Sequence, residues 1–307
     1  MNKKTSFYVK FLIVVILGLS SCVSGCTTIQ LSASPQSQVL PRQAFVQIQQ
    51  AVELEGCGLD TVTKERKCQK AVMRYVSSGA YVFHSEVSQG FSYVVTAGHS
   101  CQSSIPKEQN IDGFKVINKG SKFKVVDLNG FGHDATVVSI NNRFDLCLLR
   151  VADVLTNPPV LRVAKKEPPR GETVTNMAAP HGLYWTGTVL IFKGQFSGFH
   201  RRGYSVYTIP TKPGSSGSPI LNSQNELIGV IFAGYPMIEN VGLSSPLVAI
   251  KVFLKKSIAK GEMELWHKQN PPSAKTTIER VWIEKMKSKL ETVFGSNYTP
   301  RYTLPKE

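Results

Sequence analysis

The sequence predicts an all-β domain of the barrel or sandwich type, with short helical extensions at both ends. Between residues 77 and 250, short runs rich in Val, Ile, Tyr and Phe recur every 8–15 residues or so, with turn residues such as Asn129-Gly130 between them. Apolar residues make up 42% of the 307-residue chain, which is enough for a sizeable core. This length is typical of one or two domains.

Residues 1–21 are expected to be a lipoprotein-type signal peptide. Three lysines precede an apolar run from Phe11 to Leu19, which is too short to span a bilayer comfortably. The run ends in Leu19-Ser20-Ser21-Cys22, and Val23-Ser24-Gly25-Cys26 follows. Both tetrapeptides resemble the lipobox of bacterial lipoproteins, whose cysteine becomes the lipidated first residue. We favour Cys22, with Cys26 as the alternative; a plain cleaved signal and an uncleaved anchor are the other interpretations.

The lipid would make the protein a cell-envelope lipoprotein that faces the periplasm and has the membrane as one partner. Ser24 stands two places after Cys22, and by resemblance to Gram-negative lipoproteins a residue other than Asp there indicates the outer membrane. Residues 22–43 are rich in Ser, Gln, Thr and Pro and predict a tether between lipid and domain.

Residues 44–75 are expected to form a helical segment before the main domain. Apolar residues from Phe45 to Leu54 have helical spacing, and Lys64 to Tyr75 suggests a second helix. An oxidising compartment permits disulfides, and a Cys57–Cys68 bridge would join the two helices. No pair of cysteines has Cys-Xaa-Xaa-Cys spacing and no histidines cluster near them, so no metal site is expected.

The main β region is placed at residues 76–256 and a basic helical tail at residues 257–307. After Leu254 the β pattern stops, and Thr276 to Phe294 has the periodicity of an amphipathic helix. The formal net charge is +15, and residues 251–307 hold 12 basic against 6 acidic residues. Such a surface could attract anionic lipid or polysaccharide, or simply be solvated. No nucleic-acid-binding motif is present, so we expect no nucleic-acid partner.

A candidate nucleophile lies in the turn from Lys212 to Pro219. Ser216 stands in a Gly-Xaa-Ser-Gly sequence, whose glycines permit a tight backbone and leave room for a substrate carbonyl. The N–H groups of Gly214 and Ser216 can point at the oxygen that becomes negative during acyl transfer. Taken alone, a Gly/Ser/Pro cluster is usually an ordinary turn.

Serine needs a base, and the base needs a group that orients it. His99 follows a β-rich run that ends in Thr96-Ala97-Gly98, and Asp145 opens the apolar run Leu146 to Val151. A lone His at a strand end or a lone Asp before a strand is commonly structural. Three such residues in the order His99, Asp145, Ser216, each at the edge of a β-run, are hard to attribute to chance.

These three blocks resemble the signatures of the trypsin-like (chymotrypsin-fold) serine peptidases, most closely the bacterial heat-shock-protease type, over roughly residues 72–254. The resemblance implies two antiparallel six-stranded β-barrels with the site in the cleft between them. It also implies a serine endopeptidase that cleaves a protein or peptide substrate through an acyl-enzyme and needs no cofactor. The peptide-binding domain that such relatives often carry has no room in the remaining fifty residues or so.

The resemblance also indicates a substrate pocket. The position six before the nucleophile is Pro210, so no acid is present there to select Lys or Arg, and Ile231 stands where glutamyl endopeptidases have a histidine. A small or medium apolar P1 residue is therefore expected. The predicted pocket residues are Pro210, Thr211, Phe232, Ala233 and Gly234.

Two questions stay open at this level. Cys101 and Cys147 each follow a predicted catalytic residue by two positions, and they are either a disulfide of the first barrel or two buried thiols. The protein is either an active peptidase or a catalytically inactive lipoprotein of the same fold that only binds a partner. A third interpretation is a structural envelope lipoprotein that functions through its basic tail. Nothing in the sequence predicts the oligomeric state.

Overall fold

The computed structural model describes residues 39–59, 63, 65–111, 114–154, 157–270 and 277–295. The predicted signal peptide, both candidate lipidation cysteines and most of the predicted tether lie outside these residues. The described residues from Leu40 onward belong to one compact unit. In the part of the chain that is described, none of the helices combines the length and the hydropathy needed to cross a membrane.

The first half of this unit is a closed antiparallel barrel. Strands β1, β2, β3, β7, β6 and β5 pair in that order, β5 pairs back with β1, and β4 is added to the outer end of β5. The elements in chain order are η1 Arg42–Ala44, β1 Phe45–Leu59, β2 Arg66–His84, β3 Ser92–Ala97, η2 Gly98–Cys101, β4 Glu108–Ile111, β5 Phe114–Val126, β6 Gly132–Asn141 and β7 Leu146–Val151.

The second half is another closed barrel, in the order β10, β13, β12, β11, β8 and β9. The prediction of two antiparallel six-stranded barrels is therefore confirmed. The elements are β8 Thr173–Ala178, η3 Pro180–Gly182, β9 Leu190–Phe199, β10 Ser205–Tyr207, β11 Pro219–Leu221, β12 Leu227–Gly234, β13 Gly242–Ser245, α2 Leu247–Gln269 and α3 Thr277–Phe294.

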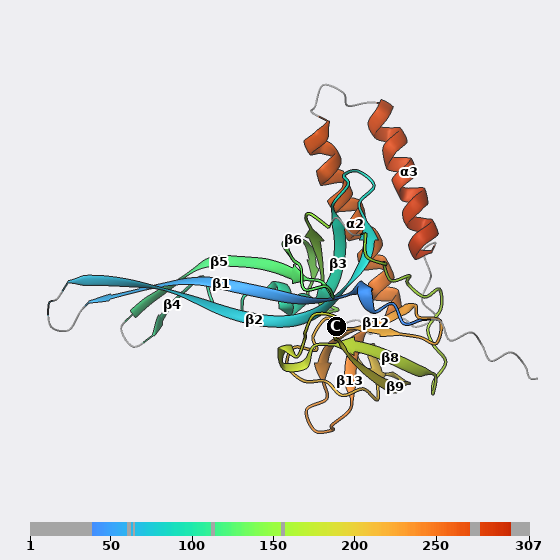
Figure 1. Ribbon diagram of the computed structural model, residues 1–307, viewed down its shortest axis with the longest axis horizontal. Coiled ribbons are helices and arrows are strands. Elements are labelled where there is room, and N and C mark those ends of the chain that lie inside the picture. The colour runs from blue at the N-terminus through green and yellow to red at the C-terminus, as the bar shows by residue number, and fades with distance from the viewer. Residues whose placement is uncertain are drawn as a thin grey trace, which may run out of the picture. The chain divides into compact units, whose positions relative to one another are not determined.

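The helical prediction for residues 44–75 is wrong, because this segment forms β1 and the first part of β2. The two strands pair over their full overlap, with Cys57 directly opposite Cys68, and the predicted disulfide joins them with a Cα–Cα distance of 4.1 Å. Residues 45–48 are buried on both faces, so the alternation that marks a half-buried strand is lost there. In Figure 1, β1, β2, β5 and β4 continue past the barrel as a long ribbon.

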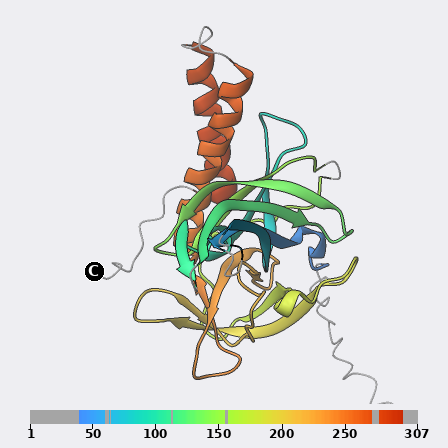
Figure 2. The ribbon, with the colours of Figure 1, turned by 90° about the vertical axis from the view of Figure 1, so that its left-hand side faces the viewer.

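Two helices close the chain, and they lie side by side in both ribbon views (Figures 1 and 2). α3 begins within one residue of the predicted amphipathic helix, whereas Leu247 to Ile250, expected as a strand, starts α2. The rings of Trp266 and Trp282 stack at 5.8 Å between the two helices.

A buried carboxylate attaches α2 to the first barrel. Glu262 is fully buried, accepts a 2.8 Å hydrogen bond from the Tyr93 hydroxyl of β3, and also accepts one from the backbone N–H of Glu86 at 2.9 Å. A carboxylate with these donors has the partners that a buried charge requires. Helix α2 is therefore part of the support of β3, the strand that leads to His99.

Candidate active site

The predicted histidine and aspartate lie together at one end of the first barrel. Strands β3 and β7 pair with Ala97 opposite Leu146, so the residues just after β3 and just before β7 are neighbours. His99 stands in η2, directly after β3, and Asp145 stands directly before β7. The register of two central strands thus joins residues that are 46 positions apart.

The contact between them is a pair of hydrogen bonds. The Nδ1 atom of His99 lies 2.7 Å from Oδ2 of Asp145, and the backbone N–H of His99 donates to Oδ1 at 2.7 Å. Since an ionised carboxylate only accepts, the Nδ1 atom must carry the proton, which leaves Nε2 of the neutral ring as an acceptor. The His99 side chain is 51% exposed and that of Asp145 25%, so this acceptor can be reached from solvent.

Asp145 adopts a backbone conformation that few residues tolerate. Its φ of +50° lies in the left-handed region, which costs a non-glycine residue on the order of 1 kcal/mol or more and which Asp accepts better than most. The two hydrogen bonds to His99 offset this cost. Asp145 thus has a strained backbone conformation at the position where its carboxylate contacts His99.

The predicted nucleophile lies in two consecutive tight turns. Ser215 N–H donates to the Lys212 carbonyl at 2.9 Å, and Ser218 N–H donates to the Ser215 carbonyl at 3.0 Å. The third residue of each turn is a glycine with positive φ, +93° at Gly214 and +85° at Gly217, as a type II turn requires. Half-buried Ser216 is the second residue of the later turn.

The same turns leave two donors unused. Among the described residues, neither the N–H of Gly214 nor that of Ser216 has a protein acceptor. Two neighbouring carbonyls of the turn accept hydrogen bonds from other parts of the chain. The Pro213 carbonyl accepts from the backbone N–H of His181 at 2.6 Å, and the Gly214 carbonyl accepts from the Ser78 hydroxyl at 2.8 Å. Both N–H groups are therefore available to an oxyanion.

Ser78, which sequence reasoning missed, connects this turn to the first barrel. This fully buried residue of β2 donates its N–H to the Ser216 carbonyl at 2.8 Å, and its hydroxyl also accepts from Ala179 N–H at 3.0 Å. A Cβ added at Gly217 would collide with the Ser78 carbonyl and the Thr96 hydroxyl, so a glycine is needed there. The serine turn thus packs on the strand that ends two residues before His99.

One contact of a complete triad is not formed. Within the described residues, the Ser216 hydroxyl makes no hydrogen bond, either to His99 or to another group. Such contacts are often long without substrate and tighten when it binds. The structure therefore brings His99 and Asp145 into direct contact and packs the turn that carries Ser216 against β2 and β3, without a hydrogen bond from the Ser216 hydroxyl.

A small cavity of about 170 Å³ opens beside Ser216. Of the predicted pocket residues, Thr211, Ala233 and Gly234 line it. Pro210 and Phe232 do not line it, so their place in a substrate pocket remains a prediction. The Phe232 ring packs instead on Tyr204, with the ring centroids 4.9 Å apart. The remaining lining residues are Lys212, Pro213, Ser215, Ser216 and Ile231.

A second disulfide supports the histidine and the aspartate. Cys101 of η2 and Cys147 of β7 are bridged, with a Cα–Cα distance of 6.4 Å. This confirms the disulfide and excludes the pair of buried thiols. The bridge covalently links the segment that carries His99 to the strand that follows Asp145.

The fold agrees with comparisons to known proteins. The model of the trypsin-like peptidase domain family matches residues 77–230. The chain belongs to this family. The matched range starts within β2 and ends within β12, and it includes His99, Asp145 and Ser216.

Two relatives of this trypsin-like peptidase are bacterial proteases. The probable periplasmic serine endoprotease DegP-like of Buchnera aphidicola subsp. Baizongia pistaciae is 27% identical over 130 residues, which cover 38% of this chain and 26% of that protein. The serine endoprotease from Yersinia pestis has a similar fold, with a TM-score of 0.50 and 20% identity over 72% of this chain and 64% of that one. The chain therefore spans about a quarter of the curated relative and about two thirds of the solved structure.

Proposed function

We propose that this trypsin-like peptidase is an active serine endopeptidase that hydrolyses peptide bonds through an acyl-enzyme, with His99, Asp145 and Ser216 as its triad. One observation carries the proposal. Asp145 accepts the Nδ1 proton of His99 at 2.7 Å and so leaves Nε2 as a base, on the segment directly after β3, the strand against which the serine turn packs.

In the proposed reaction, Nε2 of His99 takes the proton of the Ser216 hydroxyl as the serine oxygen attacks the substrate carbonyl carbon. The N–H groups of Gly214 and Ser216 donate to the resulting oxyanion, a stabilisation worth about 10²–10³-fold in kcat for one such donor. His99 then protonates the leaving amine, and water releases the acyl group by the same route. The reaction uses no metal ion and no organic cofactor.

The proposed substrate has a small or medium apolar P1 side chain. The 170 Å³ cavity beside Ser216 is lined on one wall by Ile231, Ala233 and Gly234. A Cβ added at Gly234 would collide with the Thr211 hydroxyl, so there is little room between these two walls. The ammonium group at the rim, on Lys212, lies 3.8 Å from the Glu239 carboxylate, so its charge is partly compensated.

We further propose that the enzyme works in the cell envelope, anchored through a lipid on Cys22 or, alternatively, on Cys26. The DegP-like relative is described as periplasmic. The two disulfides support an oxidising compartment, because such bonds are rare in reducing cytosol. Mass spectrometry of the mature N-terminus would test the anchor.

A second candidate function is a binding protein that has the peptidase fold but no turnover. The observation in its favour is the Ser216 hydroxyl, which makes no hydrogen bond within the described residues. A serine that remained apart from His99 when substrate was bound would not be activated.

A fluorophosphonate probe separates the two functions, because it reacts only with an activated serine. We expect the full chain to be labelled and the Ser216→Ala variant not to be. Ser288→Ala, which removes an exposed serine of α3, is the matched control and should be labelled like the parent. A folded parent protein that resists the probe would favour the binding protein instead.

A further inference from the structure

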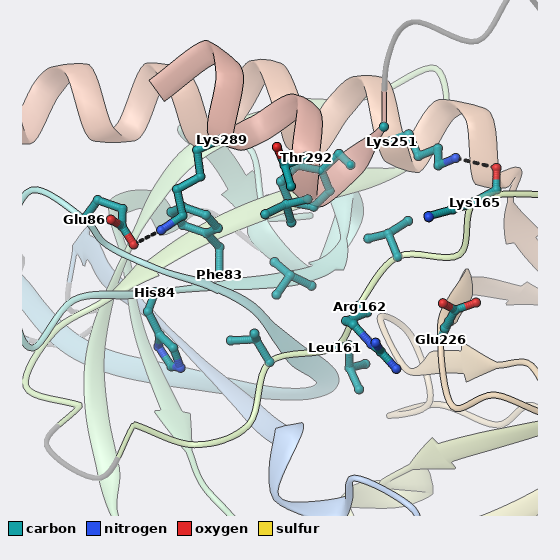
Figure 3. A pocket seen from close by; sticks show the side chains of 16 residues that line it. Phe83, His84, Glu86, Leu161, Arg162, Lys165, Glu226, Lys251, Lys289 and Thr292 are labelled. Carbon is teal, nitrogen blue, oxygen red and sulfur yellow. Dashed lines mark hydrogen bonds and ion pairs between the residues drawn. The ribbon is translucent and has the colours of Figure 1, made fainter. Parts of the chain in front are cut away.

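A large cavity lies apart from the one beside Ser216 and shares no lining residue with it. It has a volume of about 990 Å³ and lies between the C-terminal end of α3, the end of β2 and the segment 160–165 that connects the barrels (Figure 3). Sites for small organic ligands have volumes of roughly 300–1,000 Å³, so this cavity has room for a sizeable molecule. Neither the proposed chemistry nor the family resemblance gives it a role.

The middle of the cavity is apolar. Side chains from β2, from the connecting segment and from the last turn of α3 meet there, and most of them belong to the main hydrophobic core. Most of these side chains are already buried, and the apolar surface that a ligand could cover lies mainly on half-buried Val160 and Val293. The apolar lining residues are Val82, Phe83, Val160, Leu161, Val163, Val293 and Phe294.

The two ends of the cavity differ in charge. At one end, Lys289 pairs with Glu86 and lies 5.7 Å from the centroid of the Phe83 ring, so its charge is compensated (Figure 3). His84 is also occupied there, since its Nδ1 contacts the Ser92 hydroxyl and its Nε2 the Pro158 carbonyl, both at 2.8 Å.

The opposite end carries an excess of positive charge. Arg162, Lys165 and Lys251 gather there with the acid Glu226, and the buried carboxyl of Glu167 lies near Lys251 outside the cavity lining (Figure 3). Arg162 and Lys165 are exposed and form no ion pair within the described part of the chain. Lys251 donates to the Lys165 carbonyl at 2.8 Å, and burial lowers its pKa. A carboxylate or phosphate could bind there to the guanidinium group of Arg162 and to the ammonium group of Lys165.

We propose that this cavity binds a single-chain amphiphile with an anionic head, with the head at Arg162 and Lys165 and the aliphatic chain along the apolar middle. A simple inorganic anion would leave the apolar surface uncovered, and a neutral hydrocarbon would leave the cations without a partner. The site is independent of the proposed peptidase activity, and so is its test.

The test is a fluorescence titration of the purified full chain with cis-parinaric acid, a carboxylate-headed chain that becomes emissive in apolar surroundings. We expect saturable binding that oleate and dodecyl phosphate displace, and the better competitor identifies the head group. Displacement by inorganic phosphate alone, or equal displacement by oleyl alcohol, would contradict the proposal.

Substitutions in the lining test whether the amphiphile binds in this cavity. The double change Arg162→Ala, Lys165→Ala should weaken binding at least tenfold, and Val293→Trp, which fills the apolar middle, should abolish it. Lys166→Ala removes a neighbouring exposed lysine that does not line the cavity, and it should bind like the parent. Thermal unfolding of each variant checks that it is folded. Unchanged affinity in both the charge and the filling variant would overturn the proposal.

Discussion

The two barrels hold their parts of the candidate site by different means. His99 and Asp145 are fixed within the first barrel by two direct hydrogen bonds, by a strand register and by the Cys101–Cys147 disulfide. Ser216 and its turn are held from both barrels, through Ser78 of β2 in the first and through His181 and Ile231 in the second. The histidine and the aspartate are therefore positioned by the first barrel alone, whereas the position of the nucleophile depends on how the two barrels meet.

The largest loss of activity should come from breaking the contact between Asp145 and His99. Asp145→Asn keeps the shape but places an amide against Nδ1, which disfavours the tautomer needed for Nε2 to act as a base. We expect kcat on a peptide substrate to fall by about 10⁴. Near-normal turnover in Asp145→Asn, with the fold intact by circular dichroism, would show that this contact is not used in catalysis.

The disulfides provide the second comparison. In the chain-entropy model, the Cys101–Cys147 bridge, with a separation of 46 residues, stabilises the fold by about 4 kcal/mol, and the Cys57–Cys68 bridge, with a separation of 11, by about 3 kcal/mol. Replacing each pair by alanines should lower the free energy of unfolding by these amounts, as measured by urea denaturation.

Activity should separate the two disulfide variants. Loss of the Cys101–Cys147 bridge loosens the segment that carries His99, so kcat should fall, whereas loss of the Cys57–Cys68 bridge at the far end of β1 and β2 should leave kcat unchanged. An equal loss of activity in both variants would mean that the bridges act only through global stability.

The smallest effect concerns the contact between the barrels. Ser78→Ala removes the hydroxyl that holds the Gly214 carbonyl, so the peptides of the oxyanion turn become free to rotate. We expect kcat to fall about tenfold to a hundredfold with little change in KM, since the lost interaction matters most in the transition state. Ser77→Ala, at the neighbouring position of β2, is the control. A rise in KM alone would assign Ser78 to substrate binding.

The sequence predicted the histidine, aspartate and serine positions because each has a local signal: small residues before His99, an apolar run after Asp145, and glycines around Ser216. It could not predict Ser78, whose role depends on a partner 136 positions away and which has no distinctive neighbours. The prediction of two paired barrels came from the family resemblance, because strand periodicity alone predicted only a barrel or a sandwich.

The differences between prediction and structure have physical causes as well. The segment 44–75 gave no alternating pattern because the barrel buries both faces of β1 near its start, and its remaining apolar residues fall by chance at helical spacing. In the pocket, the prediction took the continuous stretch from Phe232 to Gly234 as one wall, whereas the register of β12 shifts between Ile231 and Ala233 and the Phe232 ring packs on Tyr204.

The carboxylate of Glu262 has a consequence for shortened forms of the chain. The hydroxyl of Tyr93 is buried, and its hydrogen-bond acceptor lies 169 positions later in the chain. A chain that ends before residue 262 therefore lacks the acceptor for this hydroxyl, and we expect such a truncated chain to leave Tyr93 of β3 with an unpaired buried donor.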